Sequence, residues 1–266
     1  MEKFQKVLLR IKILNKLKES LKNNKASFGS WIQISHPSII EIIANNSYKK
    51  LDWICIDMEH GAIGIESMTN LIRTIENYDI TPIVRIPKND SMWIHRVLDA
   101  GAKGLVIPMV NRGSEALEAV SEALYAPLGN RSFGYSRANS YGSDFDNYIK
   151  TANDEISIVI QIEHINAINE LDSILDVNGI DGTFIGPYDL SGSLGVLGDF
   201  ENDKYKNALN TYISKSYNHS IPTGLHIVRP NRKNIKKALD EGYKIISIGT
   251  DAVFLEEYCK NIFRNL

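Results

Sequence analysis

Charged and polar side chains recur near the carboxyl ends of short apolar runs in this sequence, on one face of each run. They are Asp57 and Glu59, Arg85, and Gln161 and Glu163. Side chains alternate between the two faces of a strand, so the isoleucines between these residues belong to the opposite face. Burying several charges costs free energy unless they pair with one another or bind a ligand. The pattern therefore predicts a catalytic site.

Glu163 and Asp189 follow two neighbouring runs and could supply hard oxygen ligands. Two carboxylates, completed by water and substrate oxygens, suit an octahedral Mg²⁺ or Mn²⁺ ion. The sequence has no cluster of cysteines and histidines that would indicate structural zinc. A Schiff-base enzyme would need a lysine inside the fold, whereas Lys103 and Lys244 stand at the beginnings of runs and Lys88 lies in a loop. The residues favour a metal over an imine.

Two further features lie near these carboxylates. His60 and His164 both stand just past the ends of runs. The glycine-rich segment 185–195 could present backbone N–H groups to an anion, with a short helix beginning near Asp189. This segment is weak as a phosphate motif, but beside a pair of metal ligands it suits a carboxylate.

Eight strand–helix units must position these side chains. The expected strands are residues 28–34, 53–58, 82–86, 104–110, 156–163, 182–185, 223–228 and 245–248. The helices that follow them are residues 39–44, 67–76, 93–100, 115–124, 167–175, 204–216, 231–239 and 252–263. Alternating strands and helices imply parallel pairing, and eight units match a closed (β/α)₈ barrel of the TIM type. A doubly wound open sheet is the alternative, but its usual glycine-rich turn after the first strand is missing.

Length and composition fit one globular barrel enzyme. The 266 residues are 43% hydrophobic and 23% charged, which excludes a disordered chain or a disulfide-stapled miniprotein. A formal net charge of −2 gives no reason to expect a nucleic-acid partner. No apolar run approaches the roughly 20 residues that span a bilayer, so we expect no membrane partner. With two cysteines and no secretory signal, we expect a cytoplasmic protein.

The charge is unevenly distributed, because residues 1–25 carry +6 and the rest of the chain carries −8. Apolar residues recur there at steps of three and four, which predicts a basic amphipathic helix ahead of a barrel domain at 26–266. We expect this helix to pack on the barrel with its lysines in water; binding to a membrane surface is the alternative. The longest irregular stretch, residues 126–143, contains Arg131 and Arg137 and suits a lid or a subunit contact.

Together these segments resemble the class II pyruvate aldolases of the hydroxy-oxo-acid (dihydroxyheptenedioate) aldolase and citrate lyase family. The resemblance runs from about Asn15 to Leu255. It is carried by the segments 28–31 (FGSW), 57–60 (DMEH), 84–87 (VRIP), 98–101 (LDAG), 106–110 (VIPMV), 161–163 (QIE), 184–191 (FIGPYDLS) and 248–251 (IGTD). It implies a metal-dependent barrel that cleaves a 4-hydroxy-2-oxo acid to pyruvate and an aldehyde, and that also runs the reverse aldol addition.

The resemblance also implies the parts that individual residues play. Glu163 and Asp189 correspond to ligands of a divalent metal, which could be Mg²⁺, Mn²⁺ or Co²⁺, and that metal acts as a Lewis acid. Arg85 corresponds to the arginine that reaches the 2-oxo oxygen. His60, oriented by Asp57, corresponds to the base that takes the proton of the 4-hydroxyl group.

The remaining assignments concern substrate binding and assembly. Gly186 and the amides approaching Asp189 would hold the pyruvate carboxylate, and Gln161 would orient the ligands. Pro187, Tyr188 and Trp31 are assigned to the substrate pocket, with packing in the core or rim as the alternative for Trp31. Asp99 corresponds to an aspartate that is contributed near the base of a neighbouring subunit. The family suggests a homo-hexamer of two trimers with the last helix exchanged between subunits, and a trimer is the alternative.

Several positions depart from the family pattern, and they bear on which aldehyde fits. These are Ala62, Ser132, His164, Tyr188, His226 and Arg229. None removes an assigned ligand or the base. Two alternative functions remain open at this point. One is a lyase of the citrate-lyase β type acting on a coenzyme A thioester, and the other is a non-catalytic barrel that docks through its basic N-terminal helix.

Overall fold

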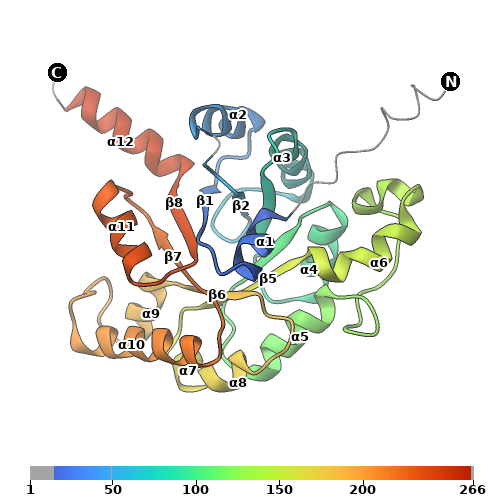
Figure 1. Cartoon of the computed structure of the whole chain (residues 1–266). Helices are drawn as coiled ribbons and strands as arrows, with labels where there is room; N and C mark the ends of the chain where they lie inside the picture. Colours follow the sequence, from blue (N-terminus) through green and yellow to red (C-terminus); the bar gives the residue numbers. More distant parts are fainter. Residues whose placement is uncertain (1–14, 49, 265–266) are drawn as a thin grey trace.

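The computed structural model of the chain describes residues 15–48 and 50–264, and it is a closed barrel of eight parallel strands (Figure 1). Each strand pairs with the next along the chain, and β8 pairs with β1. The strands are β1 (Ser27–Ile32), β2 (Trp53–Asp57), β3 (Thr81–Arg85), β4 (Gly104–Ile107), β5 (Ser157–Ile162), β6 (Gly182–Ile185), β7 (Thr223–Ile227) and β8 (Ile245–Thr250). The expected barrel and all eight strand positions are confirmed.

Helices connect the strands around the outside of the barrel. They are α2 (Pro37–Asn46), α3 (Ile65–Asn77), α4 (Ser91–Asp99), α5 (Gly113–Ala123), η2 (Arg137–Gly142), α6 (Phe145–Glu155), α7 (Ile165–Asn169), α8 (Leu171–Leu175), α9 (Pro187–Ser193), α10 (Asp203–Asn218), α11 (Arg232–Asp240) and α12 (Asp251–Phe263). Helix α6 was not predicted, and the helix expected at 167–175 is broken at Glu170 into α7 and α8. Within the described ranges, no helix combines the length and apolar character needed to cross a membrane.

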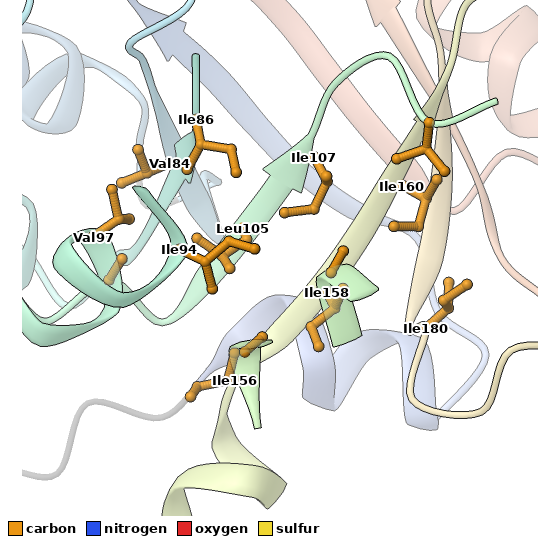
Figure 2. Packing of buried hydrophobic residues seen from close by; sticks show 14 of the residues in the cluster. Val84, Ile86, Ile94, Val97, Leu105, Ile107, Ile156, Ile158, Ile160 and Ile180 are labelled. Atoms are coloured by element: carbon orange, nitrogen blue, oxygen red, sulfur yellow. The ribbon is translucent and has the colours of Figure 1, made fainter. Parts of the chain in front are cut away.

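Two apolar layers hold the barrel together, one on each face of the sheet. Ile54 and Ile56 of β2 belong to the layer between strands and helices, whereas Cys55 between them belongs to the barrel interior. Figure 2 shows part of the outer layer, where Ile158 and Ile160 of β5 lie among buried side chains of neighbouring elements. The predicted alternation is therefore confirmed, and it leaves Asp57 on the interior face at the end of β2.

A short helix, α1 (Lys16–Lys22), closes the amino-terminal end of the barrel. Its Leu17 is fully buried in the interior cluster. The side-chain amide of Asn15 donates to the carbonyls of Lys103 and Glu155, each at 2.7 Å, next to the starts of β4 and β5. Lys18 pairs with the half-buried carboxylate of Asp181 at 3.1 Å. The helix packs on the barrel as expected, but Lys18 is bound to the protein and not exposed to water; residues 1–14 of the expected helix lie outside the described residues.

The irregular stretch 126–143 is fixed to the barrel by its two arginines. The buried Arg131 donates to Asp99 at 2.7 Å, and its guanidinium lies 4.6 Å from the ring centroid of Tyr125. Arg137 donates to the carbonyl of Ala100 at 3.0 Å and also binds Glu76. A lid must move, so these contacts argue against a lid in this stretch. They are compatible with a subunit contact, which was the other expectation.

The last helix, α12, runs outward from the end of β8 and its far end lies away from the barrel (Figure 1). Its Leu255, Tyr258 and Phe263 are exposed. Beside it, α2 and α11 flank an apolar cavity of about 690 Å³. Its lining includes Phe28, Ile42, Ile43, Leu51, Ile235, Ile248 and Phe254. The side of the barrel next to β8 and β1 therefore carries a groove with an apolar lining, which no segment of the described ranges 15–48 and 50–264 fills.

Candidate active site

An ion pair between Arg85 and Asp57 lies at the carboxyl ends of β3 and β2. Arg85 donates through Nε to Asp57 Oδ1 at 2.9 Å and through Nη2 to Oδ2 at 2.8 Å. The register of the two strands sets these residues side by side. Burial alone would raise the pKa of Asp57, but the hydrogen bonds and charge of Arg85 outweigh it and lower that pKa. The guanidinium is therefore charged and held in one orientation.

Asp57 also organises the turn that carries His60. Its carboxylate accepts from the backbone N–H groups of Glu59 and His60, each at 3.2 Å, and from the side chain of Gln33 at 2.9 Å. The His60 ring itself is about 60% exposed, and its Nε2 lies 4.0 Å from Glu59 Oε2. The structure thus connects Asp57 to the backbone of His60, whereas the sequence analysis expected Asp57 to orient the ring.

The remaining arm of Arg85 faces the other polar residues of the site. Nη1 lies 3.2 Å from Glu59 Oε2 and 3.5 Å from Gln161 Oε1. The guanidinium carbon lies 4.5 Å from the ring centroid of Trp31, which is a cation–π contact. Burial raises the pKa of Glu59, and the negative charge of Glu163 raises it further against the opposing charge of Arg85. Strands β1, β2, β3 and β5 therefore converge on one cationic group.

Glu163 is a buried carboxylate at the end of β5. Its Oε1 accepts from the backbone N–H of Met109 at 2.6 Å, and its Oε2 accepts from the side chain of Gln161. Met109 presents that N–H from a left-handed backbone conformation with φ of 54°. Burial raises the pKa of Glu163, and the charge of Asp189 also raises it against those two hydrogen bonds.

The segment after β6 brings Asp189 toward Glu163. Pro187 begins α9, as the sequence suggested for a short helix here, and Asp189 lies exposed in its first turn. Gly186 packs so closely on Glu163 that a Cβ on the glycine would lie 2.7 Å from Glu163 Cβ. The N–H of Gly186 donates to the carbonyl of Ile162 at 3.0 Å, so it is already used in the sheet. Tyr188 is exposed and packs edge-on against Phe200, with ring centroids 5.1 Å apart.

These carboxylates fit a divalent cation. Glu163 and Asp189 offer only oxygen donors, and both Glu59 and Glu163 have pKa values raised in part by neighbouring negative charge. A cation would remove that repulsion, and Mg²⁺ or a similar ion commonly takes few protein carboxylates and fills its other positions with water or substrate. Among the described residues, no three His, Cys, Asp or Glu side chains are arranged to enclose a metal. The donor set therefore suits an open site for a hard cation.

Two of the expected residues lie apart from this group. Asp99 ends α4, where it binds Arg131, and no contact in the described part of the chain joins it to His60. His164 caps α7, because its Nδ1 accepts from the backbone N–H of Asn166 at 3.1 Å.

The sequence analysis gave no individual role to Gln33, Glu59 or His226. Strand alternation had placed Glu59 on the same face as Asp57, and in the structure it lies 3.2 Å from Arg85 Nη1. His226 stacks on Trp31, with ring centroids 5.6 Å apart and planes inclined by 27°. Gln33 lies just beyond the end of β1, and the pairing of β1 with β2 brings it to Asp57. No local pattern in the sequence could have identified that contact.

Similarity to known proteins agrees with this site. The model of the "HpcH/HpaI aldolase/citrate lyase" family matches residues 27–256. A hydroxypyruvate/pyruvate aldolase of Roseobacter denitrificans is 33% identical over 94% of this chain and 96% of its own length. A 4-hydroxy-2-oxo-heptane-1,7-dioate aldolase of Salmonella heidelberg is 34% identical over 91% of this chain and 90% of its own length. The crystal structure of a family protein from Burkholderia cenocepacia superposes with a TM-score of 0.87 at 27% identity, covering 94% of this chain and 98% of that one.

The family match covers most of the barrel, including every strand that carries the Arg85 and Glu163 groups. Two relatives with more than 30% identity match over nearly the whole length of both proteins. Dependence on a divalent metal is general in the family, and the carboxylates described above fit such an ion. The chain belongs to the HpcH/HpaI aldolase/citrate lyase family and is an enzyme, a carbon–carbon lyase.

Proposed function

We propose that the enzyme cleaves a 4-hydroxy-2-oxo acid to pyruvate and an aldehyde, and catalyses the reverse aldol addition. The observation that carries this proposal is that the guanidinium of Arg85 is held by Asp57 close to the carboxylate of Glu163. Its positive charge lowers the pKa of Glu163, whereas the negative charge of Asp189 raises it. A retro-aldol cleavage needs positive charge where the 2-oxo oxygen becomes an enolate oxygen. The names of the Roseobacter and Salmonella relatives support the same substrate class.

Glu163 and Asp189 would hold the divalent metal, which we propose to be Mg²⁺, Mn²⁺ or Co²⁺. When bound, the ion supplies Lewis acidity toward the oxygens of a 2-oxo acid. Met109 and Gln161 fix the Glu163 carboxylate through the two hydrogen bonds to its oxygens. Gly186 leaves room for that carboxylate, since any side chain there would collide with Glu163.

Arg85 stabilises the charge that develops on the 2-oxo oxygen. Asp57 accepts hydrogen bonds from Nε and Nη2 of Arg85. The third nitrogen, Nη1, faces Glu59 and Gln161 and is available to substrate. Because the guanidinium is already oriented, little reorganisation is needed when negative charge forms. Trp31 contributes to the pocket by packing on this group.

His60 takes the proton of the 4-hydroxyl group. As that O–H bond breaks, the C4 carbonyl forms, the C3–C4 bond breaks, and its electron pair moves into the enolate of pyruvate. Protonation at C3 then gives pyruvate. The exposed ring of His60 lies at the mouth of the site, where the C4 end of a substrate anchored near Glu163 would reach. We propose that Asp99 of a neighbouring subunit lies beside this ring.

The pyruvate carboxylate would bind at the start of α9. The N–H of Gly186 is used in the sheet, so we assign the carboxylate to the N–H groups of Tyr188 and Asp189 in the first turn. Tyr188 packs on Phe200 at the edge of this region and would limit the size of the aldehyde.

We further propose that the enzyme is a homo-hexamer of two trimers, with a trimer as the alternative, in which α12 is exchanged between subunits. The exposed apolar residues of α12 and the apolar groove of about 690 Å³ beside it support this assembly. Removing residues 252–266 should give a smaller assembly in analytical ultracentrifugation. A truncated chain that keeps the full-length mass distribution would contradict helix exchange.

The division of the chain and its location are also proposals. We assign residues 1–25 to a basic segment, whose described helix is α1 (Lys16–Lys22), and 26–266 to the barrel, and we place the enzyme in the cytoplasm. Both would be checked directly, the first by limited proteolysis near residue 25 and the second by cell fractionation with an antibody.

Release of pyruvate from a panel of 4-hydroxy-2-oxo acids, with and without a chelator, tests the proposed reaction. Metal-dependent pyruvate release from at least one acid is expected. Activity that persists after complete removal of metal, or in Arg85→Ala, would contradict the proposal. Turnover of a coenzyme A thioester in place of the free oxo acids would instead favour the citrate-lyase β type of reaction.

A further inference from the structure

Trp31 has no polar anchor of its own. The indole is 3% exposed, and its Nε1 has no hydrogen-bond partner among the described residues. A buried tryptophan usually finds such a partner for its N–H. The orientation of this indole therefore depends on the groups that pack against its ring.

Three groups contact the Trp31 ring. Phe184 of β6 meets it edge-on, with centroids 5.9 Å apart and planes inclined by 72°. His226 of β7 stacks on it at 5.6 Å and 27°. Arg85 lies over the same ring system at 4.5 Å. An interior aromatic cluster thus reaches from β6 and β7 to the cation that the proposed reaction uses.

His226 is itself fixed, because its Nε2 lies 3.3 Å from the carbonyl of Gly249 in β8. A carbonyl only accepts, so this contact requires Nε2 to carry the proton. The charged groups that act on the ring are Arg85 and Asp57. Burial, together with the charge of Arg85, lowers the pKa of His226 to about 4, although the Gly249 carbonyl opposes this. The ring is therefore neutral at neutral pH and adds no second positive charge near Arg85.

We propose that His226 is a positioning residue, which sets the pose of Arg85 by stacking on Trp31. The inference rests on the proposed function for the role of Arg85 toward substrate, but not for the geometry of the stack. It assigns a function to a histidine that departs from the family pattern. Its flat ring fits the indole face, while its one N–H satisfies the Gly249 carbonyl.

Three substitutions separate the ring from the hydrogen bond. His226→Phe keeps a flat ring and loses the contact with Gly249, His226→Gln keeps a polar N–H and loses the ring, and His226→Leu loses both. His219→Leu is the matched control, since this histidine lies at the end of α10 and binds Asp172 on the surface.

We expect the kcat of pyruvate release to fall about tenfold in His226→Gln and His226→Leu, with a smaller change in KM, because a displaced Arg85 loses contact mainly with the transition state. His226→Phe should stay within about threefold of wild type, and His219→Leu should be unchanged. If the role of His226 were purely structural, all three variants would lose thermal stability, and kcat would not distinguish His226→Phe, which keeps a ring, from the two variants without one. Equal kcat in His226→Leu and wild type, or equal loss in His226→Phe and His226→Leu, would overturn the proposal.

Crystal structures of wild type and His226→Leu keep this test separate from the proposed reaction. In the variant the indole of Trp31 should rotate, and the guanidinium of Arg85 should leave its face. If wild type releases no pyruvate from any acid, the proposed function fails, and the positions of these two groups still decide the role of His226. Unchanged positions of Trp31 and Arg85 would refute it.

Discussion

Arg85 and Asp57 form a bidentate ion pair across neighbouring strands, with hydrogen bonds of 2.9 and 2.8 Å. A planar guanidinium matches a carboxylate in this way, whereas an ammonium group cannot. The pair therefore keeps Arg85 charged and holds one edge of its guanidinium, while the Trp31 ring supports the face of the guanidinium.

Arg85→Lys tests this distinction. The variant keeps a positive charge but loses the paired hydrogen bonds, so kcat/KM for pyruvate release should fall about 10²–10³-fold, in the range seen when one donor to a developing oxyanion is removed. Arg96→Lys on the exposed face of α4 is the matched control and should be unchanged. A kcat/KM of Arg85→Lys within threefold of wild type would show that charge alone is sufficient.

Gly186→Ala should weaken metal binding. The new Cβ would lie 2.7 Å from Glu163 Cβ and 3.0 Å from its Oε2, so the carboxylate must move. We expect the affinity for Mn²⁺ to fall about 10–100-fold, as it does when groups that orient a metal ligand are disturbed. Gly192→Ala, in the same helix, is the control, because its Cβ would meet only Leu197 at 3.5 Å. Titration calorimetry measures both, and equal affinities would contradict the placement of Glu163.

Removal of the metal should abolish activity reversibly. Dialysis against a chelator is expected to stop pyruvate release, and Mg²⁺, Mn²⁺ or Co²⁺ should restore it to different extents, since all three accept oxygen ligands. Glu163→Gln keeps the shape of the side chain but loses its charge, and it should require a much higher metal concentration for half-maximal activity. Unaltered metal dependence in this variant would remove Glu163 from the ligand set.

The half-buried His226 should make stability depend on pH. Its pKa is about 4 in the folded protein and near 6.5 in the unfolded chain, so above pH 6.5 it is neutral in both states and contributes nothing. Between pH 6.5 and 4 the unfolded chain binds a proton that the folded protein does not. Stability therefore falls as the pH drops, by up to about 3 kcal/mol.

Urea unfolding of wild type and His226→Phe at pH 7, 5.5 and 4.5 and equal protein concentration measures this contribution. The variant has no titrating ring at this position and should lose less stability than wild type across the window. The pKa of Asp57 is lowered on folding, so its contribution is lost only below about pH 4 and does not interfere. Parallel curves for the two proteins would show that His226 is not buried as described.

The sequence was sufficient to predict the barrel, since the alternation of apolar runs sets both the strands and their interior faces. It predicted a helix near Asp189 but missed α6, because Phe145–Glu155 follows a long irregular stretch and contains few apolar residues. In the site, strand ends predicted Arg85, Asp57 and Glu163. The contact of Gln33 with Asp57 depends on the pairing of β1 with β2, and that of His226 with Trp31 joins residues from opposite ends of the chain, so neither contact leaves a local pattern.

Helix α1 covers the amino-terminal end of the barrel, opposite the end that carries the site. Leu17 and Asn15 close the amino-terminal end of the barrel. Trp53 and Phe184 fill the interior between that end and the site. In the proposed binding mode, substrate and both products then pass through the carboxyl-terminal end, with pyruvate innermost at Glu163 and the aldehyde outermost near His60. The aldehyde should leave first, so pyruvate is expected to inhibit cleavage competitively and the aldehyde noncompetitively. Product-inhibition kinetics would reveal this order of departure.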